Sequence, residues 1–278
     1  MKFNVGCKLG YSIHQPSTLI FNLKVIQNEY QNILHENLQV DPQLDLEEYD
    51  LSFVENQYFR INAPLGKLRI SYNATVELTH VYADSETAQE VPPAKLPLEV
   101  LPYLYPSRYC QSDMLGNMAQ SEFGDLQPGF SRVTAICNWI YEKVEYLSGS
   151  TNAQTSAYDT VTQRAGVCRD FAHLAIAFCR ALNIPARFVA GYAYNLTPPD
   201  FHAYFEAYLS DRWYIFDASR LAPQSGLIRI GTGRDAADVA FATFFGSVQP
   251  EEMEVFAHQV FEPGVKAATF TTRAIATS

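Results

Sequence analysis

One cysteine of this chain stands where a thiol can act as a nucleophile. The run Gly166-Val167-Cys168 leads into a strongly apolar segment with helical spacing, so the sequence predicts that Cys168 begins a buried helix. Unpaired backbone N–H groups and the positive end of the helix dipole stabilise a thiolate at such a place. Environments of this kind lower the pKa of a cysteine from about 8.5 to roughly 3.5–7.5. We therefore expect Cys168 to carry the reactive thiol.

Two later residues supply the remaining parts of a thiol catalyst. His202 stands in the run Phe201-His202-Ala203, and Asp217 follows at the end of a second strand-like segment. In this order Cys168 is the nucleophile, His202 is the base that takes its proton, and Asp217 is the acid that orients the imidazole.

The pairing of His202 with Asp217 depends on the register of the hairpin that carries them. Residues 201–209 and 212–217 alternate like half-buried strands, and Ser210-Asp211 between them is suited to a two-residue turn. In the even register, His202 and Asp217 become diagonal neighbours on one face, within side-chain reach of each other. An odd-length turn would place them on opposite faces. The catalytic reading therefore requires the even register.

Other polar residues near Cys168 are expected to have structural roles. We favour a local ion pair between Arg169 and Asp170 over a capping role for Asp170 at the helix start. His173 is also expected to be structural. Cys179 lies about 16 Å further along the helix, so it cannot pair with Cys168 and is expected to pack in the core.

The histidines and cysteines give no pattern of a metal site. The six histidines are scattered without a His-Glu-x-x-His motif, and the five cysteines are an odd number without Cys-x-x-Cys. We therefore expect no metal, no cofactor and no disulfide framework. Unpaired cysteines fit a reduced, cytoplasmic setting.

Composition argues against two classes of partner. The 278 residues are 47% hydrophobic and 18% charged, which is enough for one large or two medium domains. The net charge of −10 repels phosphate backbones and argues against nucleic acid. No segment has the apolar length of a signal-peptide core or of a membrane span. The sequence predicts a soluble cytoplasmic protein without a membrane or nucleic-acid partner, and it leaves the oligomeric state open.

The chain divides into three predicted parts. Residues 1–83 are rich in alternating segments and poor in helix, which predicts a small antiparallel β-sandwich. Residues 84–127 are proline-rich at first and predict a crossover linker with little regular structure. Residues 128–278 form the predicted catalytic domain, with helices expected over 131–146 and 156–164 before the Cys168 helix.

Several separated blocks resemble the core of the transglutaminase-like superfamily, specifically its bacterial members described as candidate cysteine proteases. The matching runs are Gly166-Val167-Cys168-Arg169-Asp170, Asn183-Ile184-Pro185-Ala186-Arg187, Gly191-Tyr192, His202-Ala203 and Asp217-Ala218-Ser219. The N-terminal half is similar to the β-rich N-terminal region of those proteins. The resemblance implies an α+β protein with a papain-like cysteine proteinase core after the sandwich, and with Cys168, His202 and Asp217 as the triad. Tyr204 and Ser219 depart from the family, in which Trp and Thr are common at these positions.

Two classes of function remain open. In the first, Cys168 attacks a peptide or amide carbonyl and the acyl-enzyme is released to water, as in a cysteine peptidase or amidase. Release to an amine, as in a transglutaminase, is the alternative within this class. In the second class the site is silent and the chain is a binding or scaffold module. The Cys168 N–H is one expected oxyanion donor, and the candidates for the second are Tyr146, Asn152 and Gln154.

Overall fold

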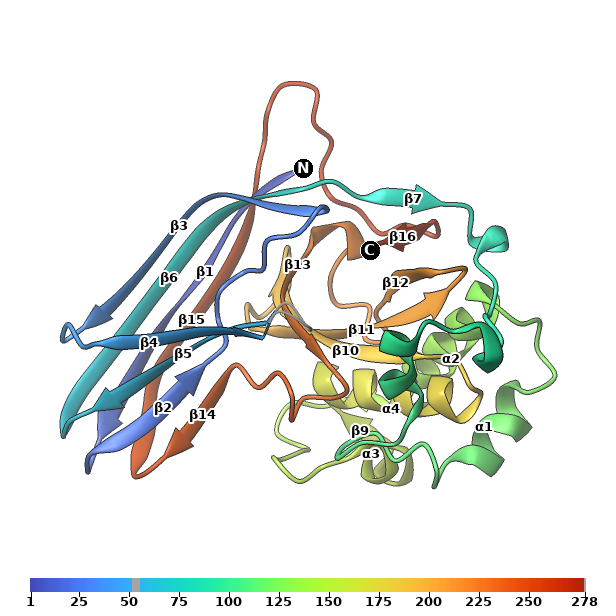
Figure 1. Cartoon of the computed structure of the whole chain (residues 1–278), viewed down its shortest axis with the longest axis horizontal. Helices are drawn as coiled ribbons and strands as arrows, with labels where there is room; N and C mark the ends of the chain where they lie inside the picture. The colour runs from blue at the N-terminus through green and yellow to red at the C-terminus, as the bar shows by residue number, and fades with distance from the viewer. Residues whose placement is uncertain (52–55, 278) are drawn as a thin grey trace.

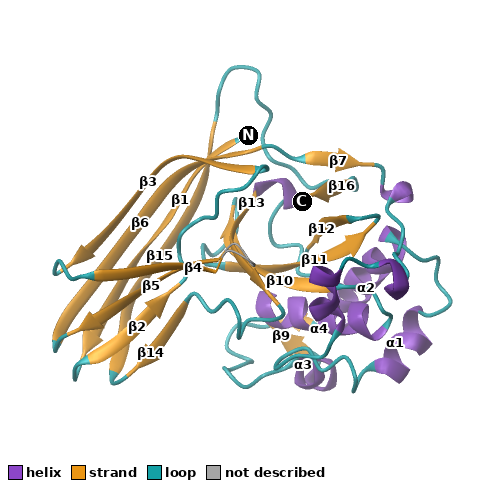
Figure 2. Cartoon of the chain, viewed as in Figure 1, coloured by secondary structure: helices purple, strands orange, loops and turns teal. Residues whose placement is uncertain are grey.

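The computed structural model of the protein describes residues 1–51 and 56–277. Figure 1 shows a β-sandwich at the left and a second, central sheet to its right, with the α-helices packed below that sheet. Figure 2 shows the same division by secondary structure, with the α-helices on the side away from the sandwich. Antiparallel sheets combined with few helices confirm the α+β class expected from the sequence.

The sandwich consists of two four-stranded sheets, of order β15-β1-β6-β3 and β14-β2-β5-β4. Alternate side chains of each strand, such as Leu68, Ile70 and Tyr72 in one strand, are buried between the sheets because successive residues point to opposite faces. The strands are β1 (Lys2–Ile13), β2 (Ser17–Phe21), β3 (Gln31–Asp41), β4 (Leu46–Leu51), β5 (Asn56–Ala63), β6 (Gly66–Leu78), β14 (Ala242–Phe245) and β15 (Val248–Val260).

Two strands of the sandwich come from the far end of the chain. β15 pairs antiparallel with β1 from Lys2 opposite Val260 to Ile13 opposite Val248, and β14 pairs with β2. The sequence analysis had confined the sandwich to residues 1–83 and had given these strands to the catalytic domain. That part of the predicted division is corrected, because each sheet of the sandwich is completed by one of them.

The segment expected to be a crossover linker is mostly irregular but contains one short helix. Three 3₁₀ turns, η1 (Ser85–Thr87), η2 (Pro93–Lys95) and η3 (Leu98–Leu104), precede α1 (Gly116–Phe123). The Phe123 ring packs edge-on against Phe178 at 5.3 Å between centroids. Residues 116–123 therefore belong to the helical core rather than to a linker.

The central sheet carries the predicted catalytic strands. Its order is β13-β10-β11-β12-β16-β7. The strands are β7 (Val81–Ala83), β10 (Ala186–Ala193), β11 (His202–Leu209), β12 (Arg212–Phe216), β13 (Leu227–Gly233) and β16 (Ala274–Ala276). Smaller elements are β8 (Glu145–Tyr146), β9 (Ala165–Gly166) and η4 (Gln224–Gly226). Every residue of β11 is buried, so the expectation of a half-buried strand was wrong for β11. Its second face is covered, for example where Tyr204 packs with Ile215 and Ile275.

Two helices, α2 (Phe130–Lys143) and α4 (Cys168–Ala181), pack on one face of this sheet, and α3 (Ala157–Gln163) packs against α4. The segments 131–146 and 156–164 expected from the sequence correspond to α2 and α3. The predicted buried helix is α4, which begins at Cys168 and is buried from Asp170 to Arg180. Within residues 1–51 and 56–277, no helix is long and apolar enough to cross a membrane.

Candidate active site

Cys168 stands at the first residue of α4 and is partly exposed to solvent. Its position is held by the tight approach of Gly166 to the first turn. A Cβ at Gly166 would lie 2.8 Å from the Cβ of Asp170, so only glycine fits there. Cys168 is therefore held at the start of a helix that is buried in the core, while the residue itself remains partly exposed to solvent.

Asp170 anchors this helix start. Its carboxylate is fully buried and its Oδ2 accepts hydrogen bonds from the Val167 N–H at 2.9 Å and from the Thr151 hydroxyl at 2.8 Å. The ion pair expected between Arg169 and Asp170 is also present, at 3.2 Å. The sequence analysis had ranked the capping role second, but Asp170 performs both roles because its two oxygens face different partners.

The hairpin has the even register that the catalytic reading requires. Leu209 pairs with Arg212, and the two turn residues Ser210 and Asp211 both have positive φ, at 46° and 63°. As a result His202 Nε2 lies 2.8 Å from Asp217 Oδ2. The predicted contact between the imidazole and the carboxylate is confirmed.

Asp217 is held on its other oxygen by Ser219. Oδ1 accepts hydrogen bonds from the Ser219 N–H at 2.8 Å and from the Ser219 hydroxyl at 2.6 Å. The sequence analysis noted Ser219 only as a departure from the family. A serine two residues after an aspartate is a known signal for a turn closed by hydrogen bonds to the carboxylate, because short polar side chains bond to nearby groups of the backbone.

The electrostatics of the buried pair favour a charged imidazole. Burial alone would lower the pKa of His202, but the carboxylate of Asp217 and the thiol of Cys168 outweigh it and raise that pKa to about 10. Burial acts to raise the pKa of Asp217, and the charge and hydrogen bond of His202 reverse this and lower it. Since Nε2 is occupied by Asp217, Nδ1 is the ring nitrogen left for Cys168, and Nδ1 has no hydrogen-bond partner among residues 1–51 and 56–277.

Of the three candidate oxyanion donors, Tyr146 lies at the thiol. Its pKa is raised, mainly by burial and then by the charge of Cys168, and both the N–H and the thiol of Cys168 act on its hydroxyl. Asn152 is used within its loop, because its carbonyl accepts from Arg169 and its side chain accepts from the Gln154 N–H at 2.8 Å. Tyr146 therefore interacts directly with Cys168, which favours it as the second donor.

His173 and Cys179 have the structural roles expected of them. His173 is buried and its Nε2 accepts a hydrogen bond from the Ala236 N–H at 3.1 Å, while its ring stacks on Tyr109. Burial is the main cause that lowers the pKa of His173. Cys179 is fully buried in the core. In the described part of the chain, no three His, Cys, Asp or Glu side chains gather as a metal site.

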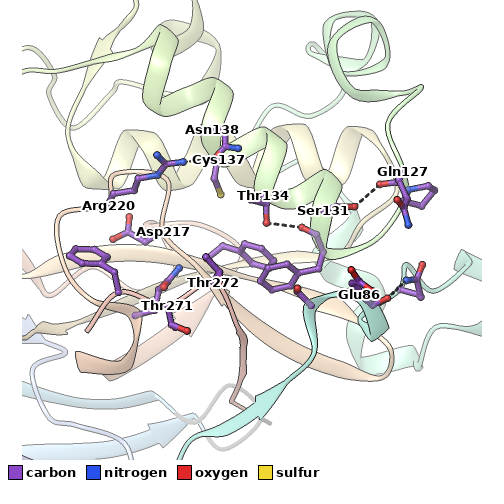
Figure 3. Close-up of a pocket in the computed structure, with 17 residues that line it drawn as sticks. Glu86, Gln127, Ser131, Thr134, Cys137, Asn138, Asp217, Arg220, Thr271 and Thr272 are labelled. Atoms are coloured by element: carbon purple, nitrogen blue, oxygen red, sulfur yellow. Dashed lines mark hydrogen bonds between the residues drawn. The ribbon is translucent and has the colours of Figure 1, made fainter. Parts of the chain in front are cut away.

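A cavity of about 1000 Å³ lies behind the carboxylate of Asp217. Figure 3 shows Asp217 and Arg220 at one end of it, below Cys137 and Asn138 of α2, and Glu86 at the other end. Arg220 donates a hydrogen bond to the Asn138 side chain. Cys168 and His202 are not among the lining residues. This cavity therefore meets the site at Asp217.

Comparison with known proteins identifies two regions of the chain. A model of the transglutaminase-like superfamily matches residues 117–218, and a model of the bacterial transglutaminase N-terminal domain matches residues 1–99. A crystal structure described as a putative cysteine protease from Cytophaga hutchinsonii is 46% identical, with a TM-score of 0.92. That match covers 99% of this chain and 97% of the other.

Curated relatives match this chain over only part of their length. An uncharacterized protein of Mycobacterium leprae is 32% identical over 116 residues, which is 39% of this chain and 42% of the relative. An uncharacterized protein of Mycobacterium tuberculosis is 31% identical over 143 residues, or 46% of each chain. This chain thus spans less than half the length of those relatives.

Proposed function

Because the chain belongs to the transglutaminase-like superfamily, we propose that its site performs thiol-dependent acyl transfer. The chain shares its fold, at 46% identity, with the crystal structure described as a putative cysteine protease. The assignment to the general class of thiol enzymes rests on the family. The finer proposal is a cysteine peptidase or amidase in which Cys168, His202 and Asp217 form the triad. The observation that carries it is the 2.8 Å bond between His202 Nε2 and Asp217, which leaves Nδ1 for the thiol.

The proposed reaction uses two half-reactions. The Cys168 thiolate attacks the carbonyl carbon of a peptide or amide, so that a C–S bond forms and the carbonyl oxygen becomes an oxyanion. The Cys168 N–H and the Tyr146 hydroxyl are the proposed donors to that oxyanion. His202 then gives its proton to the leaving amine as the C–N bond breaks. In the second half-reaction His202 takes a proton from water, the hydroxide attacks the thioester, and the acid leaves with the thiolate restored.

Hydrolysis is proposed over transfer to an amine. Water is always available at a thiol that is partly exposed, whereas an amine acceptor needs a site of its own. A catalytically silent scaffold is the remaining alternative, and the intact set of three residues with its supporting Ser219 argues against it. The proposed compartment is the reducing cytoplasm, since all five cysteines are unpaired.

The decisive experiment is an acyl-donor screen read by intact mass. The protein is incubated with peptide amides and thioesters, and a covalent acyl adduct on Cys168 is sought with and without an added primary amine. We expect an adduct that disappears by hydrolysis in wild type and that does not form in Cys168→Ser. Release mainly as the amide in the presence of the amine would support the transglutaminase alternative. A correctly folded protein that forms no adduct with any donor would support the silent scaffold.

A further inference from the structure

An acidic residue beside the site forms no ion pair with a lysine or arginine of the described parts of the chain. Asp200 precedes His202 by two residues, in the loop that leads into β11, and the residue as a whole is exposed although its carboxyl group is partly buried. Its Oδ1 accepts a hydrogen bond from the Phe201 N–H at 2.7 Å. Among the side chains of residues 1–51 and 56–277, no lysine or arginine forms an ion pair with it.

Asp200 lies close to the reacting groups. Its charge acts on His202 and on the hydroxyl of Tyr146, the residue that interacts with the Cys168 thiol. The partial burial of its carboxyl raises the pKa of Asp200, since the carboxylate is partly removed from water. The charge of His202 offsets part of this effect. A cation that binds the carboxylate directly would stabilise it further, because charge-assisted hydrogen bonds are among the strong ones.

A cavity of about 200 Å³ opens beside this carboxylate. One wall is the loop 193–200, and the other is residues 255–258 of β15, the edge strand of the sandwich. Tyr194 and Phe256 are among the lining residues. At roughly 30 Å³ for each water, this volume corresponds to about seven waters, so it suits one side chain rather than a folded partner.

We propose that this cavity is a subsite for a lysine or arginine side chain of the substrate. Asp200 binds the cationic end, and the aliphatic stem lies against the rings of Tyr194 and Phe256. Aromatic faces and a carboxylate both attract a cation, and a flexible stem covers apolar surface while its charged end reaches the acid. An acidic side chain is rejected at the same place by the charge of Asp200. The proposal deepens the proposed acyl transfer and rests on it.

The subsite also gives the sandwich a role in recognition. Residues 255–258 lie on β15, which pairs with β1 and is far from the triad in the sequence. The catalytic part supplies the acid and the sandwich supplies the opposite wall. Specificity is therefore expected to depend on both halves of the protein.

The test uses chloromethyl ketones as probes that alkylate the active-site thiol after binding. The compounds are acetyl-Ala-X and acetyl-X-Ala chloromethyl ketones, where X is lysine, norleucine or glutamate. Norleucine keeps the stem of lysine without its charge. The second-order rate of Cys168 labelling is followed by intact mass at low and high salt. In one of the two positions we expect lysine to react at least about tenfold faster than norleucine at low salt, with glutamate slowest, and the advantage to shrink at high salt.

Asp200→Asn removes the charge while its side-chain oxygen still accepts from Phe201. In this variant the lysine-to-norleucine ratio should fall to between 1 and about 2. The matched control is Asp211→Asn, which makes the same charge change in the turn at the other end of β11 and should keep the wild-type ratio. Phe256→Ala tests the wall, and it should slow the lysine and norleucine probes together.

The possible failures are distinguishable. Equal lysine and norleucine rates in wild type, or a preference that survives in Asp200→Asn, would overturn the cationic subsite while leaving acyl transfer intact. Unchanged rates in Phe256→Ala would show that β15 does not contribute to the subsite. Slow labelling of Cys168 by every ketone and by iodoacetamide alike would instead count against the proposed function itself.

Discussion

Ser219 holds the carboxylate of Asp217 on the oxygen that His202 does not use. The Ser219 hydroxyl and N–H donate to Oδ1 at 2.6 and 2.8 Å, while His202 Nε2 binds Oδ2 at 2.8 Å. Three hydrogen bonds therefore fix the plane of the carboxylate. Because the carboxylate orients the imidazole, Ser219 also determines where Nδ1 points.

Ser219→Ala should lower kcat without a large change in KM. A hydrogen bond to a charged group contributes about 1.5–3 kcal/mol, so a loss of roughly tenfold or more in turnover is expected if the imidazole becomes less well oriented. Ser219→Thr keeps the hydroxyl and should stay within about threefold of wild type by the same reasoning. The measurement is steady-state kinetics on the best acyl donor, with thermal unfolding as a check on folding. Equal losses in both variants would show that the hydroxyl bond is not what matters.

Cys168 should react with iodoacetamide faster than the other cysteines at pH 6. An ordinary thiol with a pKa near 8.5 is less than about 1% ionised at that pH, whereas a protonated His202 beside the sulfur stabilises a thiolate. Labelling is followed by mass spectrometry of peptides, with buried Cys137 and Cys179 as internal controls.

His202→Ala should move the pH profile of Cys168 labelling toward that of an ordinary thiol. Asp217→Ala should change labelling less and turnover more, since orienting the base matters most during acyl transfer. If Cys168 labels no faster than Cys7 or Cys110 across pH 5–9 in the folded wild type, the nucleophile assignment fails.

Tyr146→Phe should lower kcat and leave iodoacetamide labelling of Cys168 nearly unchanged. Removal of one oxyanion donor typically costs about 10²–10³-fold in kcat, while alkylation forms no oxyanion. Pre-steady-state kinetics with a thioester substrate measure the acylation step alone, which separates a loss of oxyanion stabilisation from a loss of thiol reactivity. Tyr158→Phe, another exposed tyrosine, is the control and should retain activity. A Tyr146→Phe variant that acylates at the wild-type rate would remove the hydroxyl from the mechanism.

Glu206→Gln should destabilise the fold. Glu206 is fully buried and lies between Arg187, at 2.7 Å, and Arg229. The substitution removes the charge of the carboxylate that contacts the buried Arg229 and the partly buried Arg187, and breaking a buried ion pair typically costs about 3–5 kcal/mol. Glu47→Gln breaks an exposed ion pair with Arg60 and should cost no more than about 1 kcal/mol. Denaturant unfolding at pH 7 measures both.

The same residue sets a pH dependence of stability. Burial acts to raise the pKa of Glu206, but the two arginines outweigh it and lower the pKa to about 2. The unfolded value is about 4.3, so the unfolded chain binds the proton first. The stabilisation is present above about pH 5 and is lost as the pH falls through about 4.3 toward 2. Glu206→Gln should flatten this part of the stability curve, and an unchanged slope between pH 5 and 3 would contradict the assignment.

The hairpin could be predicted from the sequence because local rules determine it. Alternation over 201–209 and 212–217, with two turn residues between them, allowed one register that brought His202 to Asp217. The start of α4 was predictable for the same reason, since its apolar spacing begins at Cys168. These features depend on neighbours along the chain.

The features that were missed depend on contacts far apart in sequence. β15 is exposed over much of its length, so its alternation is weak, and its partner β1 lies at the other end of the chain. The interaction of Tyr146 with Cys168 depends on the path of the loop between them, which the sequence does not indicate. The ion cluster of Glu206 joins residues of β10, β11 and β13, whose adjacency no local pattern indicates.

The return of β14 and β15 to the sandwich has a consequence for biosynthesis. A nascent chain that has passed residue 217 already carries all three residues of the proposed triad, yet β1 and β2 still lack a neighbour on one side. Until residues 242–260 emerge, these strand edges are open to pairing with other chains. Such long-range pairing also slows folding. Production of the protein is therefore expected to be sensitive to translation speed and chaperone supply, and a fragment cut after the catalytic hairpin is expected to aggregate.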